Sequence, residues 1–256
     1  MSTIDHVTIR VADLAKAKAF YSRVFELLGF VGNRQEEEQF LEWGDFSIAQ
    51  KDPDRLATTG LHIAFTADSQ ELVESWSRGM SEAGYRSDGE PGLRPQYSPD
   101  YYGAFILDPE GNSVEGVTHA RAREQETETG SIDHLWIRVE DLTPAKRFYA
   151  AIAPVVELTL HERADRFGLE GERGSFTFTE GRPTQGLHLA LGLGDQQAVQ
   201  RFHQAALAAG ARNNGEPGER PQYHPGYYGA YVIDPAGTNL EAVFHDRSMT
   251  STSASS

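Results

Sequence analysis

Six side chains in this sequence are of types that can hold a metal ion, and they form two sets of the same composition. They are His6, His62 and Glu115, followed by His134, His188 and Glu241. Each set consists of two histidines and one glutamate. Because the chain has no cysteine, any bound metal would have to be held by histidine or carboxylate side chains.

The first histidine of each set lies in a stretch that predicts a half-buried strand. In "IDHVTIRV" (residues 4–11), alternate residues give one apolar face, and the opposite face carries His6, Thr8 and Arg10. A helix-like segment follows and must bury its apolar side against the apolar face of the sheet. We therefore expect the histidine to lie on the face that no helix covers. The same alternation in "GLHIAFTA" and "SVEGV" places His62 and Glu115 on that face.

The chain is a tandem duplication. Residues 4–21 match residues 132–149 at 12 of 18 positions, and residues 91–119 match residues 217–245 at 17 of 29 positions. We predict one domain at 1–119, a polar linker at 120–131, a second domain at 132–247 and a disordered tail at 248–256.

Each copy divides again into two halves of similar order. The first half of copy one reads as a strand, a helix from Asp13 to Gly29, and short strands around 38–43 and 45–50. The second half reads as a strand, a helix from Ser69 to Gly84, and two strands joined by the turn "DPEG". Two such half-sheets around a common cavity could bring two histidines and a glutamate together.

Composition narrows the classes of partner. The chain has 256 residues, of which 39% are hydrophobic, and a formal net charge of -15, which repels nucleic acid and anionic lipid. No signal peptide and no apolar run of membrane-spanning length is evident. We expect a cytoplasmic protein with a small-molecule substrate and without nucleic-acid or membrane partners. The duplication predicts a pseudo-dimeric monomer or a homodimer.

These motifs resemble the vicinal oxygen chelate (VOC) superfamily, which includes glyoxalases, bleomycin resistance proteins and extradiol dioxygenases. The resemblance covers both copies and implies an α+β fold in which each domain is built from two βαβββ half-modules that form a cupped mixed β-sheet around a divalent metal. The ligand positions then match the six residues named above. Half-modules can pair within a copy or across copies, so the alternative sets are His6, His188, Glu241 and His134, His62, Glu115.

Two imidazoles and one carboxylate leave coordination positions open for a substrate with neighbouring oxygens. This donor set accepts Fe²⁺, Mn²⁺, Ni²⁺, Co²⁺ or Zn²⁺ and predicts a metal-dependent enzyme. Glyoxalase I has a further glutamate on the strand before the mid-domain break. Here the runs "DFSIAQ" and "SFTFTE" offer no carboxylate in phase, since Glu180 stands at the end of its run. Dioxygenase-like chemistry is therefore favoured over glyoxalase-like isomerisation or lyase chemistry.

Several further residues are candidates for contacts with a substrate. Arginines and tyrosines could bind its anionic or polar groups: Arg10 and Arg138 on the first strands, and Arg94, Tyr97, Arg220 and Tyr223 in the loops "RPQYSPDYY" and "RPQYHPGYY". Tyr102, Tyr228 and His224 are candidates for hydrogen bonding or proton transfer during catalysis. His119 and His245 close their repeats and are expected at the surface.

A protein of a different class fits the same fold. Relatives of the bleomycin-resistance type sequester a drug in an apolar groove and need no catalytic metal. Two complete ligand sets favour the enzyme, and metal content is the property that separates the two functions.

Overall fold

The structure is a computed structural model that describes residues 3–30, 34–119, 131–172 and 174–249. The predicted linker at 120–131, apart from Ser131, lies outside the described residues. The same holds for residues 250–256 of the predicted tail.

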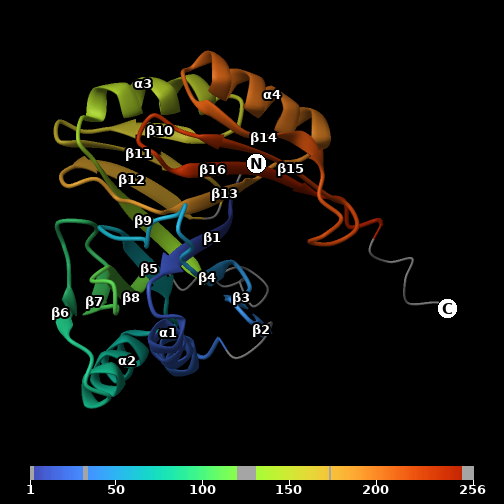
Figure 1. Ribbon diagram of the computed structural model, residues 1–256. Coiled ribbons are helices and arrows are strands. Elements are labelled where there is room, and N and C mark those ends of the chain that lie inside the picture. The colour runs from blue at the N-terminus through green and yellow to red at the C-terminus, as the bar shows by residue number, and fades with distance from the viewer. Residues whose placement is uncertain (1–2, 31–33, 120–130, 173, 250–256) are drawn as a thin grey trace. The chain divides into compact units, whose positions relative to one another are not determined.

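The order of elements repeats along the chain, as the duplicated sequence predicts (Figure 1). The first copy contains β1 (Thr3–Val11), α1 (Leu14–Leu28), β2 (Arg34–Glu37), β3 (Phe40–Trp43), β4 (Phe46–Gln50), β5 (His62–Thr66), α2 (Gln70–Glu82), β6 (Ser87–Leu93), β7 (Tyr101–Leu107) and β8 (Ser113–His119). The second contains β9 (Ile132–Val139), α3 (Leu142–Ile152), β10 (Thr159–Glu162), β11 (Arg166–Glu170), β12 (Ser175–Glu180), β13 (His188–Gly192), α4 (Gln196–Ala208), β14 (Arg212–Glu219), β15 (Tyr227–Ile233) and β16 (Asn239–His245). The expected α+β class is confirmed.

The strands form two mixed sheets of eight strands each. The hydrogen-bonded order is β14-β15-β16-β13-β1-β4-β3-β2 in one sheet and β10-β11-β12-β9-β5-β8-β7-β6 in the other. Each sheet therefore joins the first half of one copy to the second half of the other. Of the two pairings that the sequence allows, the chain adopts the crossed one.

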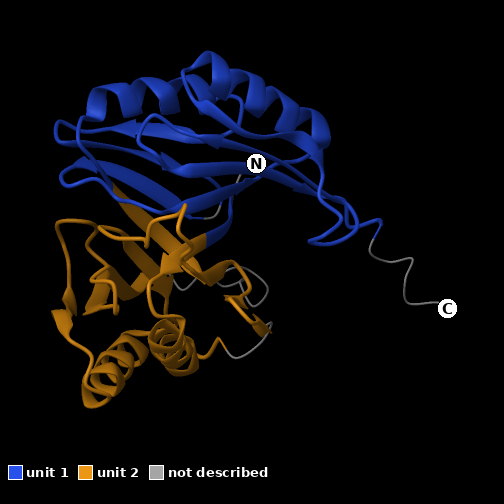
Figure 2. Cartoon of the chain, in the orientation of Figure 1, with its two compact units in different colours: residues 1–7, 138–256 blue, residues 8–137 orange. Residues whose placement is uncertain are grey.

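The chain divides into two compact units, which Figure 2 distinguishes by colour. Unit 1 comprises residues 1–7 and 138–256, and unit 2 comprises residues 8–137. In unit 1, α3 and α4 contact each other and cover one face of the strands. In unit 2, α1 and α2 contact each other, α1 lies against β4, and α2 lies against β6, β7 and β8.

The helix ends follow from local sequence. The Asp13 side chain accepts a hydrogen bond from the backbone N–H of Lys16 at the start of α1, and Ser69 does the same for Leu72 in α2. Gly29 ends α1 in the left-handed conformation (φ 86°), which a residue without Cβ adopts at no steric cost. Among the described residues, no helix combines the length and apolar character needed to cross a membrane.

Two strands of the structure are not among those that the sequence predicts. β6 ("SDGEPGL") and β14 ("RNNGEPGE") contain glycine and proline, which disfavour strands. Both are edge strands of their sheets, where proline is tolerated because one side of the strand needs no partner. Their pairing with β7 and β15 shows register shifts, so these strands are held by the neighbouring strand rather than by their own propensity.

A buried carboxylate in each copy joins the "DPxG" turn to the first helix of its own copy. Asp234 accepts hydrogen bonds from the Tyr149 hydroxyl (2.7 Å) and from the backbone N–H groups of Ala236 and Thr238, and Asp108 holds Tyr21 in the same way (2.8 Å). Burial raises the pKa of both carboxyl groups.

Replacing Asp234 by alanine is expected to lower the free energy of unfolding by about 3 kcal/mol, because the buried Tyr149 hydroxyl and two N–H groups lose their acceptor. Urea unfolding of Asp234→Ala measures this. Asp108→Ala serves as the matched variant in the other copy and should lose a similar amount. A loss below about 1 kcal/mol in both would show that water replaces the carboxylate without penalty.

Candidate metal centres

The unit 1 centre is defined by His6 on β1, His188 on β13 and Glu241 on β16. The Nε2 atoms of the two histidines lie 3.2 Å apart. The Oε2 atom of Glu241 lies 3.5 Å from Nε2 of His6 and 3.2 Å from Nε2 of His188. β13 and β16 are parallel neighbours, and β13 also adjoins β1, so the three residues come from adjacent strands.

The unit 2 centre is defined by His62 on β5, Glu115 on β8 and His134 on β9, and it has nearly the same geometry. The Nε2 atoms of His62 and His134 lie 3.3 Å apart. The Oε2 atom of Glu115 lies 3.1 Å from the first and 3.6 Å from the second. Both glutamates are buried, with 0% exposure for Glu115 and 1% for Glu241. His134 is buried as well, whereas His6, His62 and His188 are partly accessible.

The spacing of these atoms suits a metal ion. In each centre the donor atoms lie within 4.8 Å of one another. The three separations define a triangle whose corners lie about 1.9 Å from a common centre, slightly less than the about 2.0–2.2 Å of metal bonds to imidazole nitrogen and carboxylate oxygen. The three donor atoms of each centre could therefore hold one first-row metal ion together.

An aspartate behind each first-strand histidine sets the tautomer that ligation needs. Nδ1 of His6 donates to Oδ1 of Asp5 (2.8 Å), and Nδ1 of His134 donates to Oδ1 of Asp133 (2.7 Å). With Nδ1 protonated, the neutral imidazole presents the lone pair of Nε2 to the centre. Nδ1 of His188 lies 3.1 Å from the carbonyl oxygen and 2.8 Å from the side-chain amide nitrogen of Asn239, an acceptor and a donor, so these contacts do not select its tautomer.

A tyrosine hydroxyl orients each glutamate, and it belongs to the neighbour of the residue that the sequence predicts. The Tyr101 hydroxyl donates to Glu115 (2.8 Å), and the Tyr227 hydroxyl donates to Oε1 of Glu241 (2.6 Å). The predicted catalytic residues Tyr102 and Tyr228 are directed elsewhere.

The tyrosines that contact the glutamates thus stand one position before the predicted ones. The Tyr102 hydroxyl donates to Glu74 on α2 (2.8 Å), and the Tyr228 hydroxyl accepts from Gln200 on α4 (3.0 Å). Successive residues of a strand point to opposite faces, and the pair "YY" does not reveal which of its members faces the centre.

The loop residues predicted to bind substrate lie around the two centres. The Arg94 guanidinium lies over the ring of Phe105 (5.5 Å), which in turn lies beside His62 (5.7 Å). In unit 1, Arg220 lies over Tyr231 (5.7 Å), which is stacked on His188 (6.2 Å). In each unit the arginine therefore lies against an aromatic ring that in turn lies beside a ligand histidine.

Tyr97 and Tyr223 belong to the same two loops as these arginines. Tyr97 contacts Tyr101 (5.0 Å) and Trp136 (6.0 Å), and Tyr223 contacts Tyr227 (4.8 Å). Both are exposed at their outer edge, so they remain candidates for substrate contacts. Phe105 and Tyr231 are not among the site residues that the sequence predicts, although they occupy the same position in the two repeats.

The remaining predicted residues lie outside the two triads. The Arg10 guanidinium lies 3.9 Å from Asp52, and burial lowers its pKa. Arg138 is exposed, and its side chain passes Gly181. His224 is hydrogen-bonded to His245, which is not a member of either triad. Glu180 is exposed at the end of β12. Within the described residues, each donor cluster has three members.

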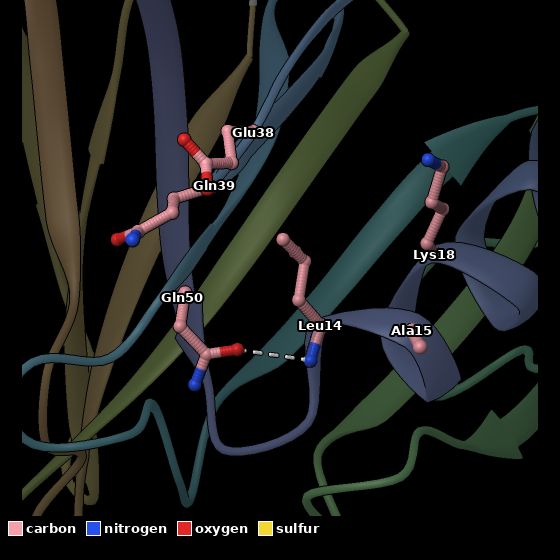
Figure 3. Close-up of a pocket in the computed structure, with 6 residues that line it drawn as sticks. All are labelled: Leu14, Ala15, Lys18, Glu38, Gln39 and Gln50. Atoms are coloured by element: carbon pink, nitrogen blue, oxygen red, sulfur yellow. Dashed lines mark hydrogen bonds between the residues drawn. The ribbon is translucent and has the colours of Figure 1, made fainter.

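A surface pocket of about 390 Å³ at the start of α1 is separate from both centres (Figure 3). It is lined by Leu14, Ala15, Lys18, Glu38, Gln39 and Gln50. The backbone N–H of Leu14 donates to the side chain of Gln50 there (3.1 Å). Because none of the lining residues belongs to a triad, this pocket does not contribute to the centres.

The two glutamates differ in their protonation behaviour. Burial raises the pKa of Glu115 to about 7, although the charge of His134 and the hydrogen bond from Tyr101 oppose it. Burial also acts on Glu241, but the hydrogen bond from His188 and the charge of His6 outweigh it and lower the pKa. Of these two glutamates, only Glu115 therefore takes up a proton near neutrality in the metal-free chain.

Metal affinity at the unit 2 centre is expected to fall by up to about tenfold for each pH unit below about 7, because a metal ion must displace the proton from Glu115. The unit 1 centre lacks this contribution. Metal titrations of His188→Ala, which keeps the unit 2 centre, and of His62→Ala, which keeps the unit 1 centre, would compare the two. Equal slopes of metal affinity against pH at the two centres would contradict the expectation.

Comparison with known proteins agrees with this architecture. Residues 3–115 match the family model of the Glyoxalase/Bleomycin resistance protein/Dioxygenase superfamily. The internal repeat carries the same order of elements into residues 132–245. The matched residues of the first copy therefore form a domain of this superfamily, and the second copy repeats their order of elements.

Solved structures of similar fold cover nearly the whole chain. Glyoxalase I from Zea mays is 19% identical, with a TM-score of 0.63 over 96% of this chain and 93% of that chain, and its V278E mutant gives 0.65 over the same shares at the same identity. A candidate dioxygenase from Bacillus subtilis is 12% identical, with a TM-score of 0.62 over 95% of this chain and 85% of that chain. At these identities the likeness concerns the fold. No curated protein matches the sequence significantly.

Proposed function

We propose that the protein is a metal-dependent enzyme that holds one divalent first-row metal ion in each unit and acts on a small molecule with two neighbouring oxygen atoms. The observation that carries this proposal is the convergence, twice in one chain, of two imidazole nitrogens and one buried carboxylate oxygen within 4.8 Å. Three electron-pair donors held this close together in a largely buried site cost free energy unless a cation lies between them.

A bound divalent ion would act as a Lewis acid on the substrate's oxygens. The chain's own residues prepare the site for it. Asp5 and Asp133 hold the first-strand imidazoles with Nε2 toward the centre. Tyr101 and Tyr227 restrict rotation of the glutamates, and their own pKa values are raised by burial and by the adjacent carboxylate, so they remain hydrogen-bond donors at neutral pH.

The aromatic side chains beside the unit 2 centre favour a flat or apolar substrate. Trp136 lies directly opposite His62 in the pairing of β9 with β5, and Phe105 lies beside His62. Side chains at directly opposite positions of paired strands share one face of the sheet. Aromatic rings on this face would exclude water from the substrate and stack against it.

Three protein ligands favour dioxygenase-like chemistry over glyoxalase-like isomerisation. An isomerase of the glyoxalase I type needs a further glutamate as ligand and base. In the matching strands β4 and β12, the only carboxylate is the exposed Glu180. The donor set of imidazole and carboxylate suits Fe²⁺, Mn²⁺, Ni²⁺, Co²⁺ and Zn²⁺ alike.

Metal analysis of protein purified without an affinity tag, followed by oxygen uptake with a panel of catechols and by assays with 2-oxoaldehydes, tests the proposal. We expect two equivalents of a first-row metal per chain and oxygen consumption with a catechol. The double variant His62→Ala, His188→Ala, which lacks one ligand in each centre, is the control and should bind little metal. Substoichiometric metal in the wild-type chain even after reconstitution would favour the metal-free sequestering function.

A further inference from the structure

The carboxyl group of Asp45 holds the residues with which the second repeat begins. Asp45 lies in the turn between β3 and β4 and is partly buried. Its Oδ1 atom accepts hydrogen bonds from the backbone N–H of Ser131 (2.8 Å) and from the Ser131 hydroxyl (2.6 Å), and its Oδ2 atom accepts one from the backbone N–H of Ile132 (3.0 Å). One side chain thus binds three donors at the start of β9.

β9 contains a β-bulge directly after these residues. In the pairing of β9 with β5, His134 lies opposite Ala64, and Ile132 lies opposite Phe65. Two steps along β9 therefore correspond to a single step along β5, and Asp133 is the extra residue of the bulge.

The bulge decides which side chains face the unit 2 centre. In a regular strand, alternation would place Ile132 on the face of His134 and would place Asp133 on the buried face with Leu135. With the bulge, Ile132 instead lies opposite the buried Phe65 and is itself buried. Asp133 is then free to accept the hydrogen bond from Nδ1 of His134 (2.7 Å). The position of the carboxylate behind this ligand thus depends on the bulge.

The bulge needs an anchor outside the ladder of β5 and β9. An extra residue interrupts the ladder, and buried backbone N–H groups require an acceptor. Asp45 provides one for Ser131 and Ile132, while the carbonyl oxygen of Ser131 accepts a hydrogen bond from the N–H of Thr66 on β5 (2.9 Å). Ser131 is therefore held from both sides. A shift of β9 by one residue, which is the alternative to the bulge, would move side chains to the other face of the sheet.

We propose that Asp45 is a positioning residue of the unit 2 centre: by holding the N–H groups of Ser131 and Ile132, it fixes the bulge at Asp133 and with it the orientation of His134. It acts on His134 through the backbone of β9. The consequence for metal binding rests on the proposed function, whereas the orientation of His134 is a property of the metal-free chain and can be tested without any metal.

The second copy has a different residue at this position. Ser175 precedes Phe176 in "GSFTFTE" as Asp45 precedes Phe46 in "GDFSIAQ". A serine hydroxyl has one oxygen with two lone pairs, so it cannot accept the three hydrogen bonds that Asp45 accepts. We therefore expect a change of Asp45 to affect the unit 2 centre and to leave the unit 1 centre as it is.

NMR of metal-free protein tests the anchor. In the wild-type chain, the backbone N–H of Ile132 should exchange slowly with solvent, and the Nδ1–H of His134 should give a resolved signal because Asp133 accepts its hydrogen bond. Asp45→Asn keeps the size of the side chain but has one acceptor oxygen instead of two. Exchange at Ile132 should then be about tenfold faster or more, and the Nδ1–H signal should shift or disappear.

Two further variants complete this measurement. Asp45→Ser introduces the residue of the second copy and should give the same result as Asp45→Asn, so the test does not depend on a single substitution. Asp13→Ala removes the N-cap of α1 in the same unit and is the matched control for a general loss of stability. It should leave the signals of Ile132 and His134 unchanged.

Metal titration tests the consequence for the centre. In a chain that keeps only the unit 2 centre (His188→Ala), Asp45→Asn should weaken binding of a first-row metal ion about tenfold, the lower end of the range for lost outer partners of a ligand. In a chain that keeps only the unit 1 centre (His62→Ala), the same change should leave the affinity unaltered.

The proposal is overturned by a His134 signal that neither Asp45 variant alters, by unchanged affinity at the unit 2 centre, or by equal weakening at both centres. Equal weakening by Asp13→Ala would also overturn it, because the effect would then follow from stability alone. Absence of metal from the wild-type chain even after reconstitution would contradict the proposed function instead, and the NMR signals of the metal-free chain would still decide whether Asp45 positions His134.

Discussion

Replacing His6 and His188 together by alanine is expected to remove one metal ion per chain and to leave the other in place. Both residues belong to the unit 1 centre, where their Nε2 atoms lie 3.2 Å apart. Outer-shell partners of a ligand contribute about 10- to 100-fold to affinity, so the loss of two ligands should weaken binding by more than that. The unit 2 centre, with His62, Glu115 and His134, should keep its ion.

The complementary double variant His6→Ala, His62→Ala distinguishes the two possible pairings of the half-modules. It removes one ligand from each centre and should abolish stoichiometric binding at both. If the halves were paired within each copy, the two double variants would exchange their results. Metal analysis after equilibrium dialysis measures the stoichiometry, and circular dichroism provides the control for folding.

The sequence predicts which face of the sheet carries the six candidate ligands, but not which ligands meet. Alternation along β1 and β5 places His6 and His62 on the face opposite to the buried residues Ile9 and Ile63. The second copy repeats this pattern with His134 and His188. The neighbour of a strand, however, is chosen by pairing between distant segments, about which a two-residue period contains no information. The crossed pairing brings His6 to His188, which lies 182 positions away.

Other parts of the site depend on similarly distant contacts or on a shift of one residue. His245 closes its repeat and reads as a surface residue, yet it bonds to Asp5, which is 240 positions away. Tyr101 and Tyr102 have the same side chain, so only the exact register of β7 decides which hydroxyl reaches Glu115. By contrast, the ends of α1 follow from Asp13 and Gly29 because capping is local.

One glycine in each copy leaves the space that the ligand glutamate occupies. Gly103 on β7 and Gly229 on β15 lie beside the carboxylates of Glu115 and Glu241. A Cβ at Gly229 would lie 2.8 Å from Oε1 of Glu241, and one at Gly103 would overlap the Glu115 carboxylate. Neither position requires an unusual φ angle, so a methyl group there acts through space and not through backbone strain.

Gly103→Ala is therefore expected to displace Glu115 from the unit 2 centre and to remove its metal ion, while the unit 1 centre keeps its own. Gly229→Ala should do the same to the unit 1 centre, with a smaller effect because its contact is less severe. Each variant thus serves as the matched control of the other. Metal titration into His188→Ala with and without Gly103→Ala measures the loss directly.

The free energy of unfolding separates this local effect from general damage to the sheet. Overpacking of a well-packed region typically costs about 1–3 kcal/mol, which is less than the roughly 5–15 kcal/mol by which a folded protein is usually stable. We expect a stable fold with one empty centre. Full metal binding by Gly103→Ala would mean that Glu115 does not need its observed position, and the assignment of this glutamate as a ligand would then fail.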